Sequence, residues 1–265
     1  MFTKFQIAVK YLRYYLTASN GKGHGTHSPF IYYVINEILN DQYHYEPYDI
    51  IEKLRNELLL DQRILRIEDF GAGSSTTGKN QRTVSSIAKY VAKSRKYGEL
   101  IFRFAYSLQP AYILELGTSI GISTCYLASA HTNTKIISCE GSKEVSEIAK
   151  ENFSKLGLTN IELITGNFDD TLSGVVDRLP ALDLVFFDGN HRKEPTLQYF
   201  KNCLQKINND SVFIFDDIHW SREMEEAWKI IGNDPAVRCT IDLFFAGVVL
   251  FRTEFKERQH FAIRF

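Results

Sequence analysis

Residues 111–123, AYILELGTSIGIS, join an apolar stretch directly to a segment that contains two glycines. The stretch AYILELG is typical of a buried strand, and Gly117 and Gly121 follow where the chain must turn sharply into a helix. Glycine has no Cβ, so a ligand can approach the backbone closely at such a turn. The sequence therefore predicts a ligand-binding turn between a strand and a helix.

Strands and helices alternate from this turn to the C-terminus. Short β-rich stretches such as KIISCEG (135–141) and SVFIFDD (211–217) alternate with helical ones such as KEVSEIAKENFSKLG (143–157). This order predicts a doubly wound α/β fold, with a parallel sheet covered on both faces. The last two strands lie too close together for a crossover helix, and they predict an antiparallel hairpin that turns near Ala246–Gly247.

The first part of the chain has a different pattern. Helical periods dominate it, as in SPFIYYVINEILN (28–40), and no convincing series of buried strands is present. We expect a helical appendage over 1–105 and an α/β domain over 106–265. The first helix should pack against the domain rather than a membrane. Its apolar face would be formed by Phe5, Val9, Leu12 and Leu16.

Composition excludes some classes of function. The 265 residues include 31 basic and 32 acidic side chains, so there is no basic excess to neutralise nucleic-acid phosphates. The four cysteines are scattered without a C-x-x-C pair and predict reduced core thiols in a cytoplasmic protein. Lys4, Lys10 and Arg13 interrupt the N-terminal apolar pattern, which predicts neither a signal peptide nor a membrane span.

An acidic residue follows the glycine turn at the end of the next predicted strand. The strand KIISCE ends at Glu140, about twenty residues further on, where a carboxylate can accept hydrogen bonds from ribose hydroxyls. The turn and the acid alone do not distinguish a dinucleotide from S-adenosylmethionine. The pattern E-x-G-x-x-x-G lacks the third glycine of the dinucleotide fingerprint, which argues against an NAD(P)-dependent oxidoreductase.

From about residue 93 onward the chain resembles the class I S-adenosylmethionine-dependent methyltransferases, and among them the catechol and caffeoyl-CoA O-methyltransferase type. The resemblance is carried by ILELGTSIGIS, ISCEGS, ITGNFDDTL, LVFFDGNH and VFIFDDIHW, in the family's order and near its spacing. It implies a mostly parallel seven-stranded sheet that ends in an antiparallel hairpin. It also implies methyl transfer from S-adenosylmethionine to an oxygen of a small molecule.

The resemblance further implies a set of cofactor contacts. Glu115 would reach the methionine ammonium group, Glu140 would hold the ribose, and Phe168 would form an apolar wall beside the adenine in the loop GNFDD. The full set is Glu115, Gly117, Thr118, Ser119, Gly121, Ser123, Glu140, Gly141, Asn167, Phe168, Asp169 and Asp188.

Three further acids end strands of the predicted sheet: Asp188, and the adjacent pair Asp216 and Asp217. Carboxylates that converge in one crevice repel each other unless they are protonated or share a cation. Mg²⁺ or another hard cation with oxygen ligands would relieve that repulsion. The metal-dependent members of the resembling family have an Asp at the first position and an Asp-Asn pair at the other two. Their metal binds a diol substrate and lowers the pKa of the hydroxyl that is methylated.

Two histidines follow these acids. His191 stands where the resembling enzymes have a lysine that acts as general base, so the resemblance implies that His191 takes the acceptor's proton, next to Asp188. His191 and His219 also leave open an imidazole-containing site for Mn²⁺, Fe²⁺ or Zn²⁺.

Two other motifs are weaker. GSSTTGKN (73–80) nearly matches the phosphate-binding loop, but Asn80 replaces the hydroxyl residue that would hold Mg²⁺. His24 and His27 lack a third ligand for zinc, and their role near an acceptor stays open. We expect a small-molecule acceptor, no nucleic-acid or membrane partner, and we allow for a homodimer. The alternative to an enzyme is a protein that binds the cofactor without methylating anything.

Overall fold

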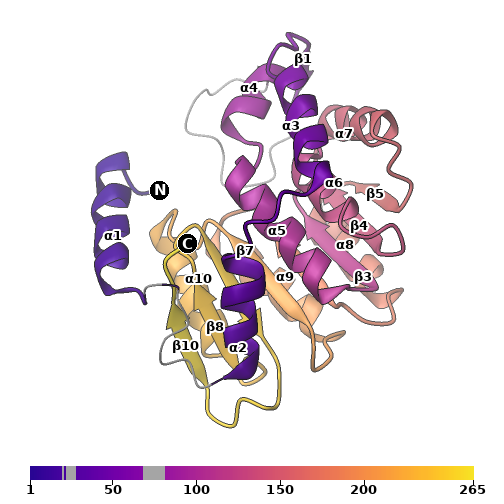
Figure 1. Ribbon diagram of the computed structural model, residues 1–265. Coiled ribbons are helices and arrows are strands. Elements are labelled where there is room, and N and C mark those ends of the chain that lie inside the picture. Colours follow the sequence, from indigo (N-terminus) through magenta and orange to yellow (C-terminus); the bar gives the residue numbers. More distant parts are fainter. Residues whose placement is uncertain (20, 22–27, 68–80) are drawn as a thin grey trace. The chain divides into compact units, whose positions relative to one another are not determined.

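The structure is a computed structural model, shown in Figure 1. The described residues are 1–19, 21, 28–67 and 81–265. The sequence predictions for His24, His27 and the stretch 73–80 therefore lie outside the described residues. The chain forms two compact units, one made of residues 42–175 and one that combines 1–41 with 176–265.

The unit of residues 42–175 contains three parallel strands in register, β3 (Tyr112–Leu116), β4 (Lys135–Glu140) and β5 (Ile161–Thr165). A separate antiparallel pair consists of β1 (Ile64–Arg66) and β2 (Gln81–Thr83). The helices that begin in this unit are α3 (Glu46–Leu58), α4 (Val84–Tyr90), α5 (Arg95–Leu108), α6 (Ile122–Ala128), α7 (Lys143–Lys155) and α8 (Phe168–Asp177).

The other unit contains parallel and antiparallel strands. They are β6 (Leu184–Phe187), β7 (Val212–Asp216), β8 (Cys239–Asp242), β9 (Ala246–Leu250) and β10 (Gln259–Ala262). β9 runs antiparallel to both β7 and β8, while β6 pairs with β7, and β10 with β8, in parallel. The helices are α1 (Lys4–Thr17), α2 (Pro29–Tyr33), the π-helix η1 (Val34–Leu39), α9 (Lys193–Leu204) and α10 (Arg222–Gly232).

The predicted fold class is confirmed, because the strand order β10-β8-β9-β7-β6-β3-β4-β5 describes a mostly parallel sheet with an antiparallel end. It has eight strands rather than seven, since β10 adds to β8. The hairpin turn was placed wrongly. It lies at 243–245, with Phe244 in the left-handed region at φ 69°, and Ala246 begins β9. Gly247 serves packing instead, because a Cβ there would lie 2.5 Å from the Trp228 ring.

The strands lie in the hydrophobic core. β7 and β9 are buried along their whole length, as expected for strands covered on both faces. All four cysteines are buried and none of them is in a disulfide, which confirms the prediction of core thiols. Among the described residues, no helix is both long and apolar enough to cross a membrane.

Helix α1 forms as predicted, but the prediction of its packing face was wrong. The face formed by Phe5, Val9, Leu12 and Leu16 is exposed, with residue exposures of 77%, 51%, 59% and 69%. The buried residue is Tyr14, which packs with Ala18 and Ile7 against Phe244 of the β8–β9 turn. The Tyr14 hydroxyl donates a hydrogen bond to the carbonyl of Ile263. A tyrosine whose hydroxyl has a hydrogen-bond partner can be buried without a penalty for that group.

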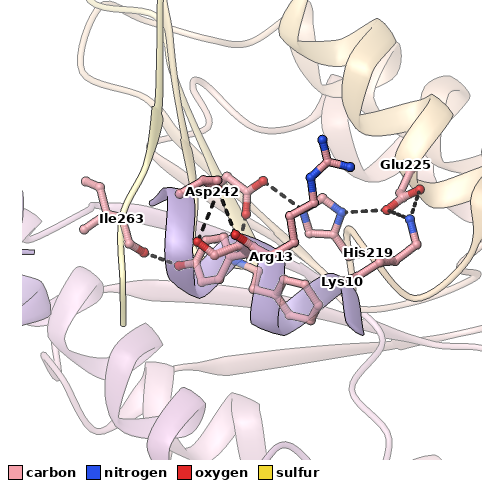
Figure 2. Close-up of polar contacts among 9 residues, drawn as sticks. Lys10, Arg13, His219, Glu225, Asp242 and Ile263 are labelled. Atoms are coloured by element: carbon pink, nitrogen blue, oxygen red, sulfur yellow. Dashed lines mark hydrogen bonds and ion pairs between the residues drawn. The ribbon is translucent and has the colours of Figure 1, made fainter. Parts of the chain in front are cut away.

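A charged cluster also holds α1 in place, as Figure 2 shows. Lys10 donates to Glu225 of α10 at 2.9 Å, and the same carboxylate lies 3.0 Å from Nδ1 of His219. The other ring nitrogen of His219 lies 2.8 Å from Asp242 of β8. Burial disfavours the charged imidazole, but Asp242 and Glu225 outweigh this effect and raise the pKa of His219.

Candidate functional site

The turn after β3 is built by left-handed backbone. Gly117, Ser119 and Gly121 have φ angles of 108°, 51° and 85°. The amides of Gly117 and Thr118 both donate to the carbonyl of Cys139 on β4, at 2.9 and 3.1 Å. A Cβ on Gly121 would lie 2.6 Å from the Phe153 ring, so only glycine fits there. The turn predicted from the sequence is therefore present, and α7 packs directly beneath it.

Glu140, at the end of β4, organises this turn. Its Oε2 accepts a hydrogen bond from the amide of Ser119 at 2.8 Å, and its Oε1 accepts one from the amide of Ser142 at 2.9 Å. A carboxylate oxygen has two lone pairs and can accept more than one hydrogen bond. Gly141, between these contacts, is a half-buried bend. The carboxylate thus both shapes the turn and presents acceptors at the strand end.

Glu115 on β3 is completely buried. Its Oε2 accepts hydrogen bonds from the hydroxyls of Thr124 and Ser138, each at 2.5 Å, while its Oε1 is buried without a hydrogen-bond partner. Burial raises the pKa of Glu115, and the nearby hydroxyls of Ser123, Ser138 and Thr124 oppose the rise. A buried carboxylate with one unsatisfied oxygen is the kind of group that a ligand's ammonium would complete, directly or through a water.

The remaining predicted cofactor residues have mixed environments. Thr118 is buried, and its hydroxyl pairs with that of Ser138 rather than opening to the surface. Asn167 precedes α8, and its side chain accepts from the amide of Asp169 at 3.2 Å, as a helix cap does. Phe168 and Asp169 were expected in a loop, but they form the first turn of α8. Phe168 is buried and Asp169 is exposed.

In the unit that contains β6 and β7, three predicted residues come together. β6 and β7 are parallel and in register at Phe187 and Phe215, so the next residues, Asp188 and Asp216, end the strands at the same level. A ligand atom from each of Asp188, His191 and Asp216 can be chosen so that all lie within 4.8 Å of one another. Asp216 is buried, and the other two are half-buried. His191 Nε2 lies 3.7 Å from Asp188 Oδ1.

Asp217 and His219 lie outside this group. β7 ends at Asp216, so Asp217 lies just beyond the strand. Its backbone has a left-handed φ of 54°, and its amide donates to the carbonyl of Phe245 at 2.7 Å. Both ring nitrogens of His219 are engaged by Glu225 and Asp242. The predicted metal role of Asp217 stays a prediction.

The sequence predictions missed the residues that support these groups. Ser138 and Thr124 hold Glu115, and the signal for Ser138 was a lone hydroxyl in the middle of the apolar strand KIISCE. Asn190 was also missed. Its φ of 53° turns the chain back between Asp188 and His191, and its amide group donates to the Tyr199 hydroxyl at 3.1 Å. A Gly-Asn pair directly after a strand is a turn signal that could have found it.

The mostly parallel sheet with an antiparallel β9, the glycine turn after β3 and the acid at the end of β4 define a class I S-adenosylmethionine-dependent methyltransferase fold. Residues 114–218 match a family model described as a methyltransferase domain. Over these residues the sequence is similar to that family, and the fold around them is that of the class I enzymes.

The curated relatives include two catechol O-methyltransferases. The one from Niastella koreensis is 28% identical over 131 residues, which cover 48% of this chain and 58% of that protein. The one from Mycobacterium tuberculosis is 27% identical over 130 residues, which cover 48% of this chain and 57% of that protein. The chain thus spans little more than half the length of these relatives.

Solved structures share the fold over most of the chain. A methyltransferase of Podospora anserina, solved with SAH bound, covers 95% of this chain and 97% of its own, with a TM-score of 0.58 and 14% identity. An O-methyltransferase from Streptomyces achromogenes, solved with SAM, covers 84% of this chain and 95% of its own, with a TM-score of 0.56 and 17% identity. At these identities the likeness shows the fold.

Proposed function

We propose that this protein transfers a methyl group from S-adenosylmethionine to an oxygen atom of a small-molecule acceptor. The observation that carries the proposal is the unsatisfied, buried Oε1 of Glu115 next to the left-handed turn that Glu140 organises. The two relatives named catechol O-methyltransferase support oxygen as the accepting atom and a catechol as the first acceptor to test.

The residues present fit the cofactor. Glu115 would face the methionine ammonium, and Glu140 would accept from the ribose hydroxyls while it keeps its hold on Ser119. Gly117, which is half-buried, would let the cofactor approach the backbone of the turn, whereas Gly121 lets α7 pack against it. Phe168 would give the adenine an apolar neighbour. When bound, S-adenosylmethionine supplies an electrophilic methyl group on a sulfonium. The protein's own task is then to hold the donor and the acceptor oxygen in line.

The acceptor hydroxyl must lose its proton as the new bond forms. We assign this step to the group of Asp188, His191 and Asp216, where two carboxylates and an imidazole lie within 4.8 Å. Carboxylates of this kind can stabilise positive charge, and an imidazole can take a proton or bind a cation. A divalent cation held here would lower the pKa of the acceptor hydroxyl.

The first test is calorimetric titration of the purified chain with S-adenosylmethionine and, separately, with NAD. We expect binding of S-adenosylmethionine only. Glu140→Ala should lose about 1–3 kcal/mol of binding free energy, the usual cost of removing a charged hydrogen bond. Glu147→Ala is the matched control. It removes the same charge from an exposed position on α7, where Glu147 pairs with Lys150.

Turnover is then measured with methyl-labelled S-adenosylmethionine and a panel of catechols. Labelled O-methyl products would support the proposal. Tight cofactor binding without transfer to any hydroxyl acceptor would favour a protein that only binds the cofactor. Failure to bind S-adenosylmethionine at all would contradict the proposal.

A further inference from the structure

The metal-dependent enzymes that this chain resembles use three oxygen ligands, from an Asp and an Asp-Asn pair. The group of Asp188, His191 and Asp216 would instead offer two oxygens and one imidazole nitrogen. Two members are carboxylates at the ends of β6 and β7, and the third is an imidazole brought back by the left-handed turn at Asn190. Asn190 is itself held, because it donates to Tyr199 of α9 and accepts from Arg192 at 2.8 Å. The position of His191 is therefore set by a supported turn.

The spacing suits one shared cation. In octahedral coordination, an ion that lies about 2.1 Å from each ligand atom holds adjacent ligand atoms about 3 Å apart. Ligand atoms on opposite sides of the ion are then about 4.2 Å apart. The 3.7 Å between His191 Nε2 and Asp188 Oδ1 lies in this range, and it is too long for a hydrogen bond between the two. The three ligand atoms lie within 4.8 Å of one another, so small side-chain rotations would bring them around one ion. A cation also offsets the repulsion between two carboxylates that end adjacent strands.

We propose that Asp188, His191 and Asp216 form a divalent cation site that prefers a transition-series ion such as Mn²⁺ or Zn²⁺ to Mg²⁺. The proposal rests on the proposed function, because it specifies the cation of the same site. Mg²⁺ favours oxygen ligands and water and gains little from an imidazole nitrogen, whereas first-row transition ions accept one, Zn²⁺ more strongly than Mn²⁺. His191, and not Asp217, is then the third protein ligand.

This assignment changes the chemistry of the histidine. A nitrogen that donates its lone pair to a cation cannot accept a proton at the same atom. As a ligand, His191 would therefore not act as general base, and a cation held by the three residues would lower the pKa of the acceptor hydroxyl. The proton then passes to solvent or to a carboxylate oxygen that is not bound to the ion.

Metal binding by the full chain, without any acceptor, tests the proposal. The protein is freed of cations with a chelator and titrated calorimetrically with Mn²⁺, Mg²⁺ and Zn²⁺. We expect one ion per chain, with Mn²⁺ and Zn²⁺ bound about tenfold or more tightly than Mg²⁺. Electron paramagnetic resonance of the Mn²⁺ complex should show hyperfine coupling to one imidazole nitrogen.

Three variants assign the ligands. His191→Ala should abolish the nitrogen coupling and weaken Mn²⁺ binding about tenfold or more. Asp217→Asn, which recreates the Asp-Asn pair of the resembling enzymes, should leave both readouts unchanged. His260→Ala is the control, because it removes an exposed imidazole that contacts Thr240 in the same unit. Unfolding curves of each variant check that it folds.

The outcomes separate this proposal from the proposed function. Four results would each overturn the proposed site. They are no ion binding, an affinity for Mg²⁺ equal to that for Mn²⁺, Mn²⁺ binding without nitrogen coupling, and weaker Mn²⁺ binding by Asp217→Asn. The affinity for S-adenosylmethionine is measured in the same samples. If the cofactor binds but the metal prediction fails, only the cation site is wrong, whereas a failure of cofactor binding counts against the methyltransferase proposal itself.

Discussion

Single buried polar residues determine how this site can work. Glu115 is fully buried with one oxygen unsatisfied, and two hydroxyls fix the other oxygen. Its environment raises its pKa, so part of the cost of burying the charge can be avoided by protonation. A bound ammonium would remove that cost in another way, by pairing with the carboxylate. The stability of the fold should therefore depend, through Glu115, both on pH and on cofactor binding.

We predict a specific pH dependence for stability. Because the pKa of Glu115 is higher in the folded state than its ordinary value of 4.5, the folded protein binds the proton more tightly. The free energy of unfolding should therefore fall as the pH rises from about 4.5 through the raised pKa. Glu115→Gln should flatten this part of the profile. Urea unfolding between about pH 5 and pH 8 measures it.

The control for this prediction is Glu147→Gln, which changes an exposed carboxylate with about half of its side chain accessible. It should keep the pH profile of the wild type. If the free energy of unfolding changes with pH to the same extent in Glu115→Gln and in the wild type, Glu115 is not the group that causes the pH dependence.

Among the elements, α1 shows most clearly that the apolar face of a helix does not decide how it packs. Tyr14 and Tyr11 contact Phe244, with ring centroids 5.3 and 5.0 Å apart, while the stripe from Phe5 to Leu16 is exposed. Phe244 can take part because the β8–β9 turn holds it in the left-handed region, with its amide donating to Asp242 at 2.8 Å. The aromatic surface at Phe244 thus determines which face of α1 packs against the β8–β9 turn.

Two substitutions in α1 test which face is docked. Tyr14→Ala should reduce the free energy of unfolding by about 3 kcal/mol, because it removes a buried ring and leaves a cavity. Leu12→Ala, on the exposed stripe, should change it by less than about 0.5 kcal/mol. Chemical denaturation measures both. Limited proteolysis gives a second readout, because an undocked α1 should be cut early at Arg13. Equal effects of the two variants would contradict the observed packing.

At the scale of the whole molecule, the two halves of the proposed chemistry lie in different parts of the chain. The predicted cofactor residues from Glu115 to Asp169 lie in the unit of residues 42–175, and the cation group lies in the unit that includes 176–265. The boundary predicted near residue 105 separates helical from alternating sequence, and it stays a prediction.

This division predicts how ligands stabilise the molecule. S-adenosylmethionine at a hundred times its dissociation constant should raise the free energy of unfolding by about 2.7 kcal/mol. Glu140→Ala should lose most of this gain at the same concentration. Asp216→Ala should keep it, because Asp216 belongs to the cation group. Thermal unfolding with and without the cofactor measures this gain for the wild type and for both variants. An equal loss of the gain in Glu140→Ala and Asp216→Ala would contradict the division of roles.

The sequence by itself was sufficient to predict the fold class, the alternation of strands and helices from β3 to β9, the glycine turn and the acids at the strand ends, but it missed β10 and the start of α8. These features depend on local rules: apolar periodicity, the conformational freedom of Gly117 and Gly121, and the fact that parallel strands present their carboxyl ends at one edge. Such rules act over a few residues, and for that reason they can be recognised in a single chain.

Tertiary structure alone decided which groups meet. It turned His191 back towards Asp188 and Asp216, left Asp217 outside the group, and engaged His219 with Glu225 and Asp242. It also gave Gly247 a packing role against Trp228 and docked α1 through Tyr14. The physical reason is the same in each case. Whether two side chains meet depends on the direction in which the backbone points them and on the surface that lies opposite, and a local sequence pattern records neither.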